Sequence, residues 1–226
     1  MSALVADGVT RSVEDYLKAI YRLSSGGLPA TTSDIAGLLD LSPPSVSGMV
    51  KRLSEQGLLE HLPYRGVVLT SAGRRVALRT VRRHRLIESY LVAFLGYSWD
   101  AVHDEAERLE HAISDELAER MAAALGNPGV DPHGDPIPTA DGDVAEVAGM
   151  PLSDVPEGAA VEIRRVSEHE AERLRYLAAL GLVPGAVVTV TGRQPFDGPI
   201  TIRTAAGERV LGAAMAREIL CARVFE

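Results

Sequence analysis

The segment HDEAERLEH, residues 103–111, gathers the residue types that bind divalent metal ions. If the segment is helical, spacings of three and four residues bring two imidazoles and two carboxylates to one side: His103, Glu107, Glu110 and His111. Oxygen-rich ligands with one or two imidazoles suit Mn²⁺ or Fe²⁺, whereas structural zinc sites usually gather thiolates. A solvated helix face is the alternative interpretation, and spacing alone does not choose between the two.

Two other pairs of residues favour the metal interpretation. Glu14 and Asp15 lie on a predicted first helix, and His84 and Glu88 lie one turn apart on a predicted long helix. Acidic groups brought together from separate helices repel one another, and a bound dication removes that repulsion. The sequence therefore predicts metal ligands that come from helices far apart along the chain.

Length and composition limit the number of domains and the class of protein. The chain has 226 residues, 46% hydrophobic and 24% charged, which is enough for two or three compact domains. No stretch has the pattern of a secretory leader or a membrane span, so we expect a cytoplasmic protein that contacts no membrane. The formal charge of −8 argues against nonspecific coating of nucleic acid. The single cysteine, Cys221, lies in an apolar run and is expected to be a small buried residue.

A helix-turn-helix is predicted in the first part of the chain. Residues 12–24 carry an apolar stripe of helical period. A short helix capped by Thr32 or Ser33 follows, and a second helix opens with Pro43-Pro44, since proline is favoured in a first helical turn.

Two short strands, at residues 58–62 and 67–70, follow the second helix directly, which predicts a winged helix. Hydroxyls on that helix can reach base edges and phosphates, and proline rings can touch a thymine methyl group. The expected DNA contacts are Ser42, Pro44, Ser45, Ser47, Lys51, Arg52 and Arg65. A three-helix packing unit without a nucleic-acid role is the alternative.

Two long helices are expected next, one from Ser71 to Gly96 and one from about residue 98 to Gly126. Both carry apolar stripes that two helices beside a winged helix cannot bury by themselves, so we expect them to form the core of a homodimer. Twofold symmetry would then make the DNA site palindromic.

The C-terminal third has a different pattern. Residues 127–151 are dense in proline, glycine and aspartate and predict a loop and linker. Short strands with one intervening helix then predict a small β-barrel: residues 159–166, 186–192, 199–205 and 218–225 with helix 169–181. The expected α+β organisation is a winged-helix domain over 1–73, a helical dimerisation and metal domain over 74–140, a linker over 141–151 and a barrel over 152–226.

The whole chain resembles the diphtheria toxin repressor family of metal-dependent transcriptional regulators, which includes the manganese transport regulators. The segments that carry the resemblance follow the family order: SVEDYLKAIYRL, LSPPSVSGMVKRL, YRGVVLTSAGRR, RRHRLIESYL, VHDEAERLEHAISDEL and DPHGDPIP. The C-terminal domain resembles the SH3-like domain of the longer members, which is similar to small ferrous-transport accessory domains, particularly in LRYLAALGLVPGAVVTV. The resemblance implies a DNA-binding repressor that is activated by metal, not an enzyme.

The resemblance also implies two sets of metal ligands. The activating site would consist of Asp15, Glu107, Glu110 and His111. A second site would consist of His84, Glu88 and His103, completed from the barrel by Glu168, with His169 or Glu170 as alternatives. In the shorter manganese regulators the position of His84 joins a paired-metal site instead, so its partner stays open. His133, a single loop histidine, is expected to be structural or exposed.

Departures from the iron-type pattern favour manganese. Iron-responsive members have a methionine where this chain has Asp15 and a cysteine where it has Glu107, so sulfur is replaced by hard carboxylate oxygen. Mn²⁺ is the expected effector, Fe²⁺ the alternative, and Co²⁺, Ni²⁺, Zn²⁺ or Cd²⁺ are expected surrogates in vitro. Lys18 stands where the short manganese regulators have an acid, and Gly48 stands where a glutamine often reads DNA.

The predicted mechanism couples metal binding to operator affinity. A dication that joins ligands from the DNA-binding domain and the dimer helices favours one arrangement of the domains, and it can shift the equilibrium only by its differential affinity. The expected targets are metal-uptake genes. The alternative functions are a metal-dependent hydrolase and a winged-helix regulator that senses a ligand other than metal. The sequence has no H-E-x-x-H pattern, which argues against the hydrolase.

Overall fold

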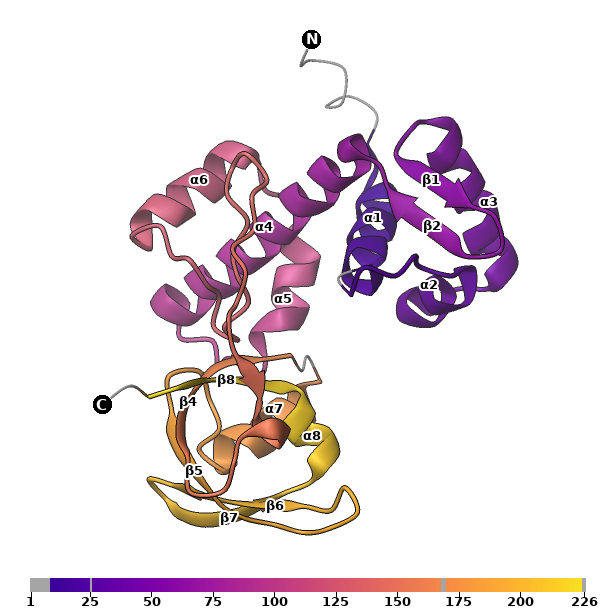
Figure 1. Cartoon of the computed structure of the whole chain (residues 1–226). Coiled ribbons are helices and arrows are strands. Elements are labelled where there is room, and N and C mark those ends of the chain that lie inside the picture. Colours follow the sequence, from indigo (N-terminus) through magenta and orange to yellow (C-terminus); the bar gives the residue numbers. More distant parts are fainter. Residues whose placement is uncertain (1–8, 25, 168–169, 225–226) are drawn as a thin grey trace. The chain divides into compact units, whose positions relative to one another are not determined.

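The computed structural model describes residues 9–24, 26–167 and 170–224 of the chain (Figure 1). Helix α1 (Arg11–Leu23) begins after Thr10, whose carbonyl oxygen accepts hydrogen bonds from the N–H groups of Val13 and Glu14 at 2.9 and 3.1 Å. Its apolar stripe is buried, including Tyr16 and Leu17, as the helical period predicts.

Helices α2 (Thr32–Leu39) and α3 (Pro43–Glu55) form the predicted helix-turn-helix. The cap of α2 is Thr31 and not Thr32 or Ser33: the Thr31 hydroxyl accepts from the Asp34 N–H at 3.1 Å, and the Asp34 carboxylate bonds back to Thr31. This reciprocal capping box satisfies two N–H groups at once, which neither alternative could do because it lacks an acid three residues later.

Strands β1 (Leu59–Leu62) and β2 (Gly66–Leu69) pair in antiparallel register and lie beside α3, which confirms the winged helix (Figure 1). Gly66 has φ +117°, and a Cβ there would lie 2.3 Å from the carbonyl oxygen of Ala30. Only glycine permits this approach, which brings the hairpin against the segment before α2 through the bridge between Ala30 and Val67.

Helix α4 (Ser71–Leu95) ends where expected, at Gly96 with φ +71°. The single helix expected after it is wrong, because the structure has two: α5 (Val102–Leu109) and α6 (Asp115–Ala124). The break arises because the Ser114 hydroxyl accepts from the Leu117 N–H at 3.2 Å and starts a new helix with two acids in its first turn.

The chain divides into two compact units. The first contains the described residues up to Arg83 together with Glu110–Ile113 and Pro138–Asp143, and the second contains His84–Leu109, Ser114–Ile137 and the described residues from Val144 onward. The turn after α5 thus belongs to the unit that contains the winged helix, although α5 and α6 belong to the other.

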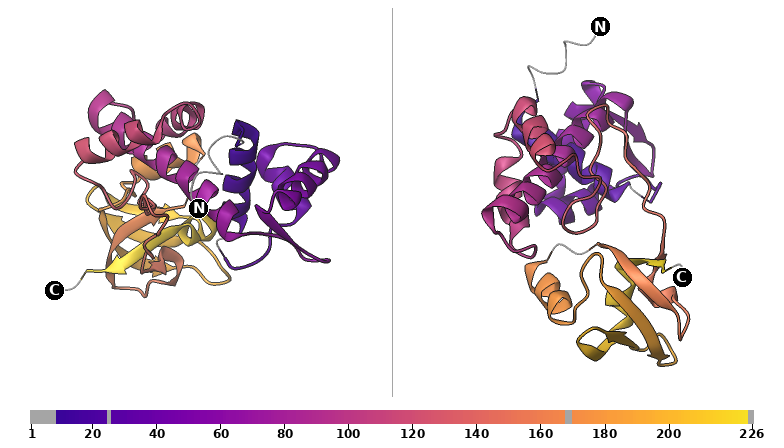
Figure 2. Two further views of the ribbon diagram at one scale, coloured as in Figure 1. Left: turned by 90° about the horizontal axis from the view of Figure 1, so that it is seen from above. Right: turned by 90° about the vertical axis from the view of Figure 1, so that its left-hand side faces the viewer.

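The second unit contains the predicted C-terminal barrel, whose curved sheet has the strand order β3-β8-β4-β5-β6-β7 (Figure 2). Its elements are β3 (Met150–Pro151), the 3₁₀ turn η1 (Leu152–Asp154), β4 (Ala160–Val166), α7 (Ala171–Ala179), β5 (Val187–Arg193), β6 (Ile200–Thr204), β7 (Gly207–Leu211), α8 (Ala213–Arg217) and β8 (Ile219–Arg223). Alternating residues of β4, β5, β6 and β8 fill the core, which includes Cys221.

The sequence missed β7 and α8, because β7 is an edge strand with mostly exposed side chains and α8 spans five residues without a side-chain cap. The prediction for Cys221 is confirmed: the thiol is buried, and burial raises its pKa to about 12. Among the described residues, no helix combines the length and apolar character needed to cross a membrane.

Candidate metal centres and DNA-binding surface

The first cluster lies in the first unit and joins α1 to the turn after α5. The Nε2 atom of His111 lies 2.8 Å from Asp15 Oδ1 and 3.2 Å from Glu110 Oε1. Glu110 is fully buried and His111 is nearly so, whereas Asp15 is one-third exposed. Two carboxylates and one imidazole therefore meet at one point from residues nearly 100 positions apart, and this donor set fits a hard divalent cation.

Glu14 orients the imidazole of this cluster. Its Oε2 atom lies 2.6 Å from His111 Nδ1, and its Oε1 atom pairs with Arg83 at 3.5 Å and Arg79 at 3.8 Å. A carboxylate paired with two guanidinium groups is suited to accept a hydrogen bond, which favours the neutral tautomer with the proton on Nδ1 and the Nε2 lone pair directed toward Asp15 and Glu110. This is the tautomer that a metal ligand requires.

The expected common helix face of residues 103–111 is wrong in part. Helix α5 ends at Leu109, so only His103 and Glu107 lie on it, and Glu110 and His111 lie in the following turn. The extra freedom of the turn lets both side chains reach α1. Glu107 belongs to the second unit, where its carboxylate lies 3.7 Å from His103 Nε2.

The second cluster lies in the second unit and is centred on Glu88, which is 2% exposed. Its Oε1 atom lies 3.0 Å from His84 Nε2 and 3.1 Å from His103 Nδ1, and the two imidazole nitrogens are 3.0 Å apart. The structure thus brings together the three residues predicted for the second site, one turn apart on α4 and across to α5. His84 contacts Glu88 and His103, and a ligand atom of Glu107, in the same unit, also lies within 4.8 Å of a His84 ring nitrogen, so these contacts do not assign His84 to one ligand set.

A further imidazole reaches Glu88 from the loop that follows α6. His133 is 1% exposed; its Nδ1 lies 3.7 Å from Glu88 Oε2, and its Nε2 donates to the carbonyl oxygen of Trp99 at 2.8 Å. Asp131 joins Glu88 and His133 in a second group of closely spaced ligand atoms. Sequence reasoning did not count these residues as ligands; the signal was the spacing D-P-H-G-D, two acids and an imidazole around a glycine turn.

Burial and mutual attraction shift the pKa values in this cluster. Burial alone would raise the pKa of Glu88, but hydrogen bonds from His103, His133 and His84 hold it well below its usual value. Burial opposes protonation of His133, yet attraction to Glu88 and Asp131 and the Trp99 carbonyl raise its pKa to about 9. Burial, together with repulsion from Glu88 and Asp135, raises the pKa of Asp131 to about 7.

The loop that carries His133 is held rigidly. Asp131 Oδ1 accepts from the N–H groups of His133 and Asp135 at 2.8 and 3.0 Å, and the His133 carbonyl accepts from the Val166 N–H at 2.9 Å. Gly134 has φ +87°, and a Cβ there would lie 2.0 Å from the carbonyl oxygen of Arg164. The loop therefore packs directly on β4 of the barrel, within the second unit.

The residue predicted to complete the second site from the barrel is not placed. Glu168 and its alternative His169 lie outside the described residues. Glu170 is described, and its carboxylate lies 3.0 Å from Arg173 Nε in an exposed ion pair at the start of α7.

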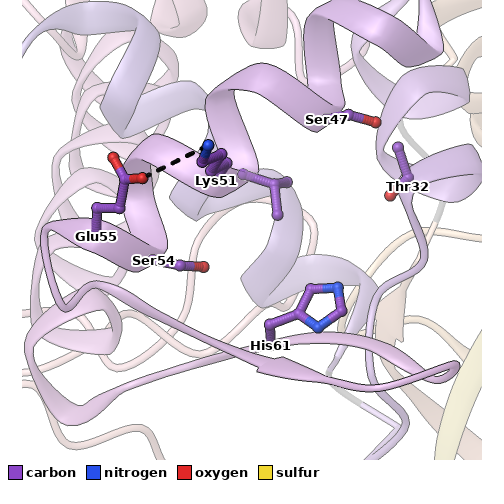
Figure 3. A pocket seen from close by; sticks show the side chains of 7 residues that line it. Thr32, Ser47, Lys51, Ser54, Glu55 and His61 are labelled. Atoms are coloured by element: carbon purple, nitrogen blue, oxygen red, sulfur yellow. Dashed lines mark ion pairs between the residues drawn. The ribbon is translucent and has the colours of Figure 1, made fainter.

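The residues predicted to contact DNA are exposed on α3 and on the hairpin tip. Pro44, Ser45, Ser47, Lys51 and Arg52 line the outer side of α3, Ser42 precedes it, and Arg65 lies between β1 and β2. A pocket of about 580 Å³ opens between α3, the start of α2 and β1, and Ser47, Lys51 and His61 lie around it (Figure 3). Lys51 Nζ lies 4.0 Å from Glu55 Oε1. Exposed ion pairs of this kind are weak, so a DNA phosphate could take the place of the Glu55 carboxylate.

Comparison with known proteins agrees with this arrangement. Residues 8–67 match the N-terminal DNA-binding domain of iron-dependent repressors, residues 70–139 match their metal-binding and dimerisation domain, and residues 150–223 match the FeoA domain. The iron-dependent repressor IdeR of Mycobacterium leprae is 36% identical over 191 residues, covering 79% of this chain and 83% of that protein.

Solved structures are similar over almost the whole chain. A manganese-dependent transcriptional repressor in complex with manganese is 39% identical with a TM-score of 0.85, covering 94% of this chain and all of that one. The repressor ScaR with bound Zn²⁺ is 33% identical with a TM-score of 0.80, covering 94% of this chain and 99% of that one. The protein therefore belongs to the diphtheria toxin repressor family and is a metal-dependent, DNA-binding transcriptional repressor.

Proposed function

We propose that Mn²⁺ is the physiological effector of this repressor and that Asp15, Glu110 and His111 bind it, with Glu107 as the further ligand that family resemblance assigns. The observation that carries the proposal is the donor set of the first cluster, in which two carboxylates and one correctly oriented imidazole converge. Carboxylate oxygen suits Mn²⁺, and the three grouped side chains, Asp15, Glu110 and His111, offer oxygen and nitrogen rather than sulfur. Fe²⁺ is the competing effector, and Co²⁺, Ni²⁺, Zn²⁺ and Cd²⁺ serve as surrogates in vitro.

The position of Glu110 and His111 explains how metal would act on the DNA-binding unit. Both residues lie in a turn that is covalently flanked by α5 and α6, and their partner Asp15 lies on α1, which packs in the winged-helix core. A cation that holds the turn to α1 restricts the movement of the two units relative to each other. A typical allosteric coupling of about 1–3 kcal/mol changes operator affinity by roughly 5- to 150-fold.

We also propose a homodimer that reads a palindromic operator. Near the end of α4 and on α6, large apolar side chains are exposed: Phe94, Leu95, Tyr97 and Leu117. Exposed large apolar side chains of this kind are what an isologous dimer interface covers, and twofold symmetry would then pair two winged helices with two half-sites. Repressed genes of metal uptake complete a feedback loop, since the metal that activates the repressor stops its own import.

The second cluster is assigned as an additional metal centre. Its ligands are His84, Glu88 and His103, and His133 and Asp131 supply further donors from the loop on β4. Imidazole-rich sites suit Zn²⁺ and Fe²⁺ better than Mn²⁺. This centre would therefore fill with a different preference from the first and support the fold of the second unit.

Calorimetric titration of the purified protein with Mn²⁺ tests the proposal. Asp15→Ala and Glu110→Ala should each remove the tightest Mn²⁺ binding, whereas Glu116→Ala, which removes an exposed carboxylate on α6, should leave it unchanged. Unchanged affinity in both site variants would favour the rival in which a winged-helix regulator senses a ligand other than metal. A parallel anaerobic titration with Fe²⁺, read out as operator binding, decides between the two effectors.

A further inference from the structure

The first cluster contains a buried ammonium group. Lys18 is on α1, one turn after Asp15, and is 6% exposed. Its Nζ donates to both carboxylate oxygens of Glu110, at 2.9 and 2.7 Å, and Glu110 is fully buried. The same carboxylate that is proposed to bind the metal therefore has an ammonium group on it.

The carboxylates in and beside the first cluster pair with different cationic side chains. Glu14 is paired with Arg79 and Arg83, so its charge is compensated apart from the metal ligands. Of the remaining carboxylates, Glu110 accepts hydrogen bonds from the ammonium group of Lys18, and Asp15 lies against His111. A buried ion pair of this kind holds a carboxylate in place, and removing one partner leaves an uncompensated charge in a poorly solvated site.

We propose that Lys18 sets the metal concentration at which this repressor responds. In the metal-free protein its two hydrogen bonds hold the Glu110 carboxylate in place beside His111. When a dication binds Asp15, Glu110 and His111, the ammonium group bonded to the Glu110 carboxylate repels the dication, which weakens binding. The affinity is thereby tuned downward, so that the site fills only when the metal is abundant. This inference rests on the proposed function of the cluster.

The test compares Lys18→Met, which keeps the length of the side chain without its charge, with Lys18→Arg, which keeps the charge. The probe is Mn²⁺ alone, titrated calorimetrically into the full-length protein at neutral pH. Lys18→Met should bind Mn²⁺ more tightly than the wild type by about tenfold or more, because the repulsion between two cations in a buried site is removed. Lys18→Arg should remain within about threefold of the wild type.

Thermal unfolding gives a second readout that does not depend on DNA. In chelator the Tm of Lys18→Met should be lower than that of the wild type, because Glu110 has lost its counter-charge, and the rise in Tm on adding Mn²⁺ should be larger. If Lys18→Met does not fold, Lys18→Gln provides the same comparison, since an amide keeps one donor without the charge.

Equal or weaker Mn²⁺ binding by the folded uncharged variants would overturn the inference. That outcome is distinct from failure of the proposed function, which would be absence of Mn²⁺ binding in the wild type or its persistence in Asp15→Ala. Tighter binding in Lys18→Met together with a lower Mn²⁺ concentration for operator binding would establish Lys18 as the residue that sets the response threshold.

Discussion

The two clusters of candidate metal ligands each bring acidic groups together in a buried place, and they do so with different side chains. The first places two carboxylates and one imidazole together; lysine pairs with one of these carboxylates, and arginine pairs with the neighbouring Glu14. The second places Glu88 among three imidazoles, whose charge depends on their protonation, with Asp131 beside His133. Both the ligand types and the counter-charges differ between the two clusters. We therefore expect the clusters to differ in metal preference and in their effect on DNA binding.

The largest difference is expected from removing the central carboxylate of each cluster. Glu110→Ala should abolish the increase in operator affinity caused by Mn²⁺, roughly 5- to 150-fold. It should also lower the free energy of unfolding of the metal-free protein by about 3–5 kcal/mol, because the buried Lys18 loses this partner. Glu88→Ala should leave most of the Mn²⁺ response. Gel-shift titration and denaturant unfolding measure both effects, and equal loss of response in the two variants would contradict the division of roles.

A smaller change should separate the clusters through the orientation of His111. Glu14→Gln replaces the carboxylate that fixes the imidazole tautomer, and outer-shell changes of this kind cost about 10- to 100-fold in metal affinity. The loss should be confined to the first cluster, so Zn²⁺ binding in an Asp15→Ala background should not change. Glu55→Gln, an exposed position on α3, is the matched control for calorimetry.

Metal preference itself distinguishes the clusters. In Asp15→Ala, where the second cluster remains intact, Zn²⁺ should bind at least about tenfold more tightly than Mn²⁺, because imidazole ligands favour zinc. Adding Glu88→Ala should remove that Zn²⁺ site. A competition assay with a chromophoric chelator measures both affinities, and Mn²⁺ binding as strong as Zn²⁺ binding would show that the imidazoles do not set the preference.

A substitution in the loop that carries His133 should lower the stability of the second unit without affecting metal binding at the first cluster. Gly134→Ala combines a positive φ with a Cβ 2.0 Å from a backbone oxygen, so we expect a cost of roughly 1–3 kcal/mol and weaker Zn²⁺ binding. Gly158→Ala, also at positive φ but with open space around it, separates backbone strain from the steric clash. Thermal unfolding followed by circular dichroism should show the larger loss for Gly134→Ala and unchanged Mn²⁺ activation.

The smallest expected effect is a gain. Gly48 lies within α3, and a Cβ there meets no atom within 4 Å. Gly48→Ala should therefore stabilise the protein by about 0.5–1 kcal/mol without affecting either metal cluster. Denaturant unfolding measures the gain, and a loss of stability would mean that the helix requires glycine at this position.

Local chemistry made much of the fold predictable. The Pro43-Pro44 start of α3 and the glycine after α4 are unambiguous, and both element ends were predicted correctly. The break between α5 and α6 was not, because an apolar stripe continued across it and outweighed the capping serine, Ser114. Competition between a helical period and a cap is decided by tertiary contacts, here those of the turn with α1.

The candidate sites show the same limit more sharply. Helical spacing singled out the pair His84 and Glu88 and, separately, His103; the family resemblance grouped the three, whose contacts are local on α4 or cross to α5. The pairing of Lys18 with Glu110 spans 92 positions, and no local pattern indicates it. His133 was undervalued for the same reason, since its role depends on a loop conformation fixed by a glycine and by the barrel strand beneath it.

The central claim is that a cation joining Asp15 to Glu110 and His111 controls DNA binding. The direct measurement is the affinity of the full-length protein for an operator duplex, selected from random sequence with the Mn²⁺-loaded wild type, in Mn²⁺ and in chelator. The wild type should bind roughly 5- to 150-fold more tightly in Mn²⁺, and Asp15→Ala should show no difference between the two conditions. Equal binding by the wild type in chelator and in Mn²⁺ would contradict the claim.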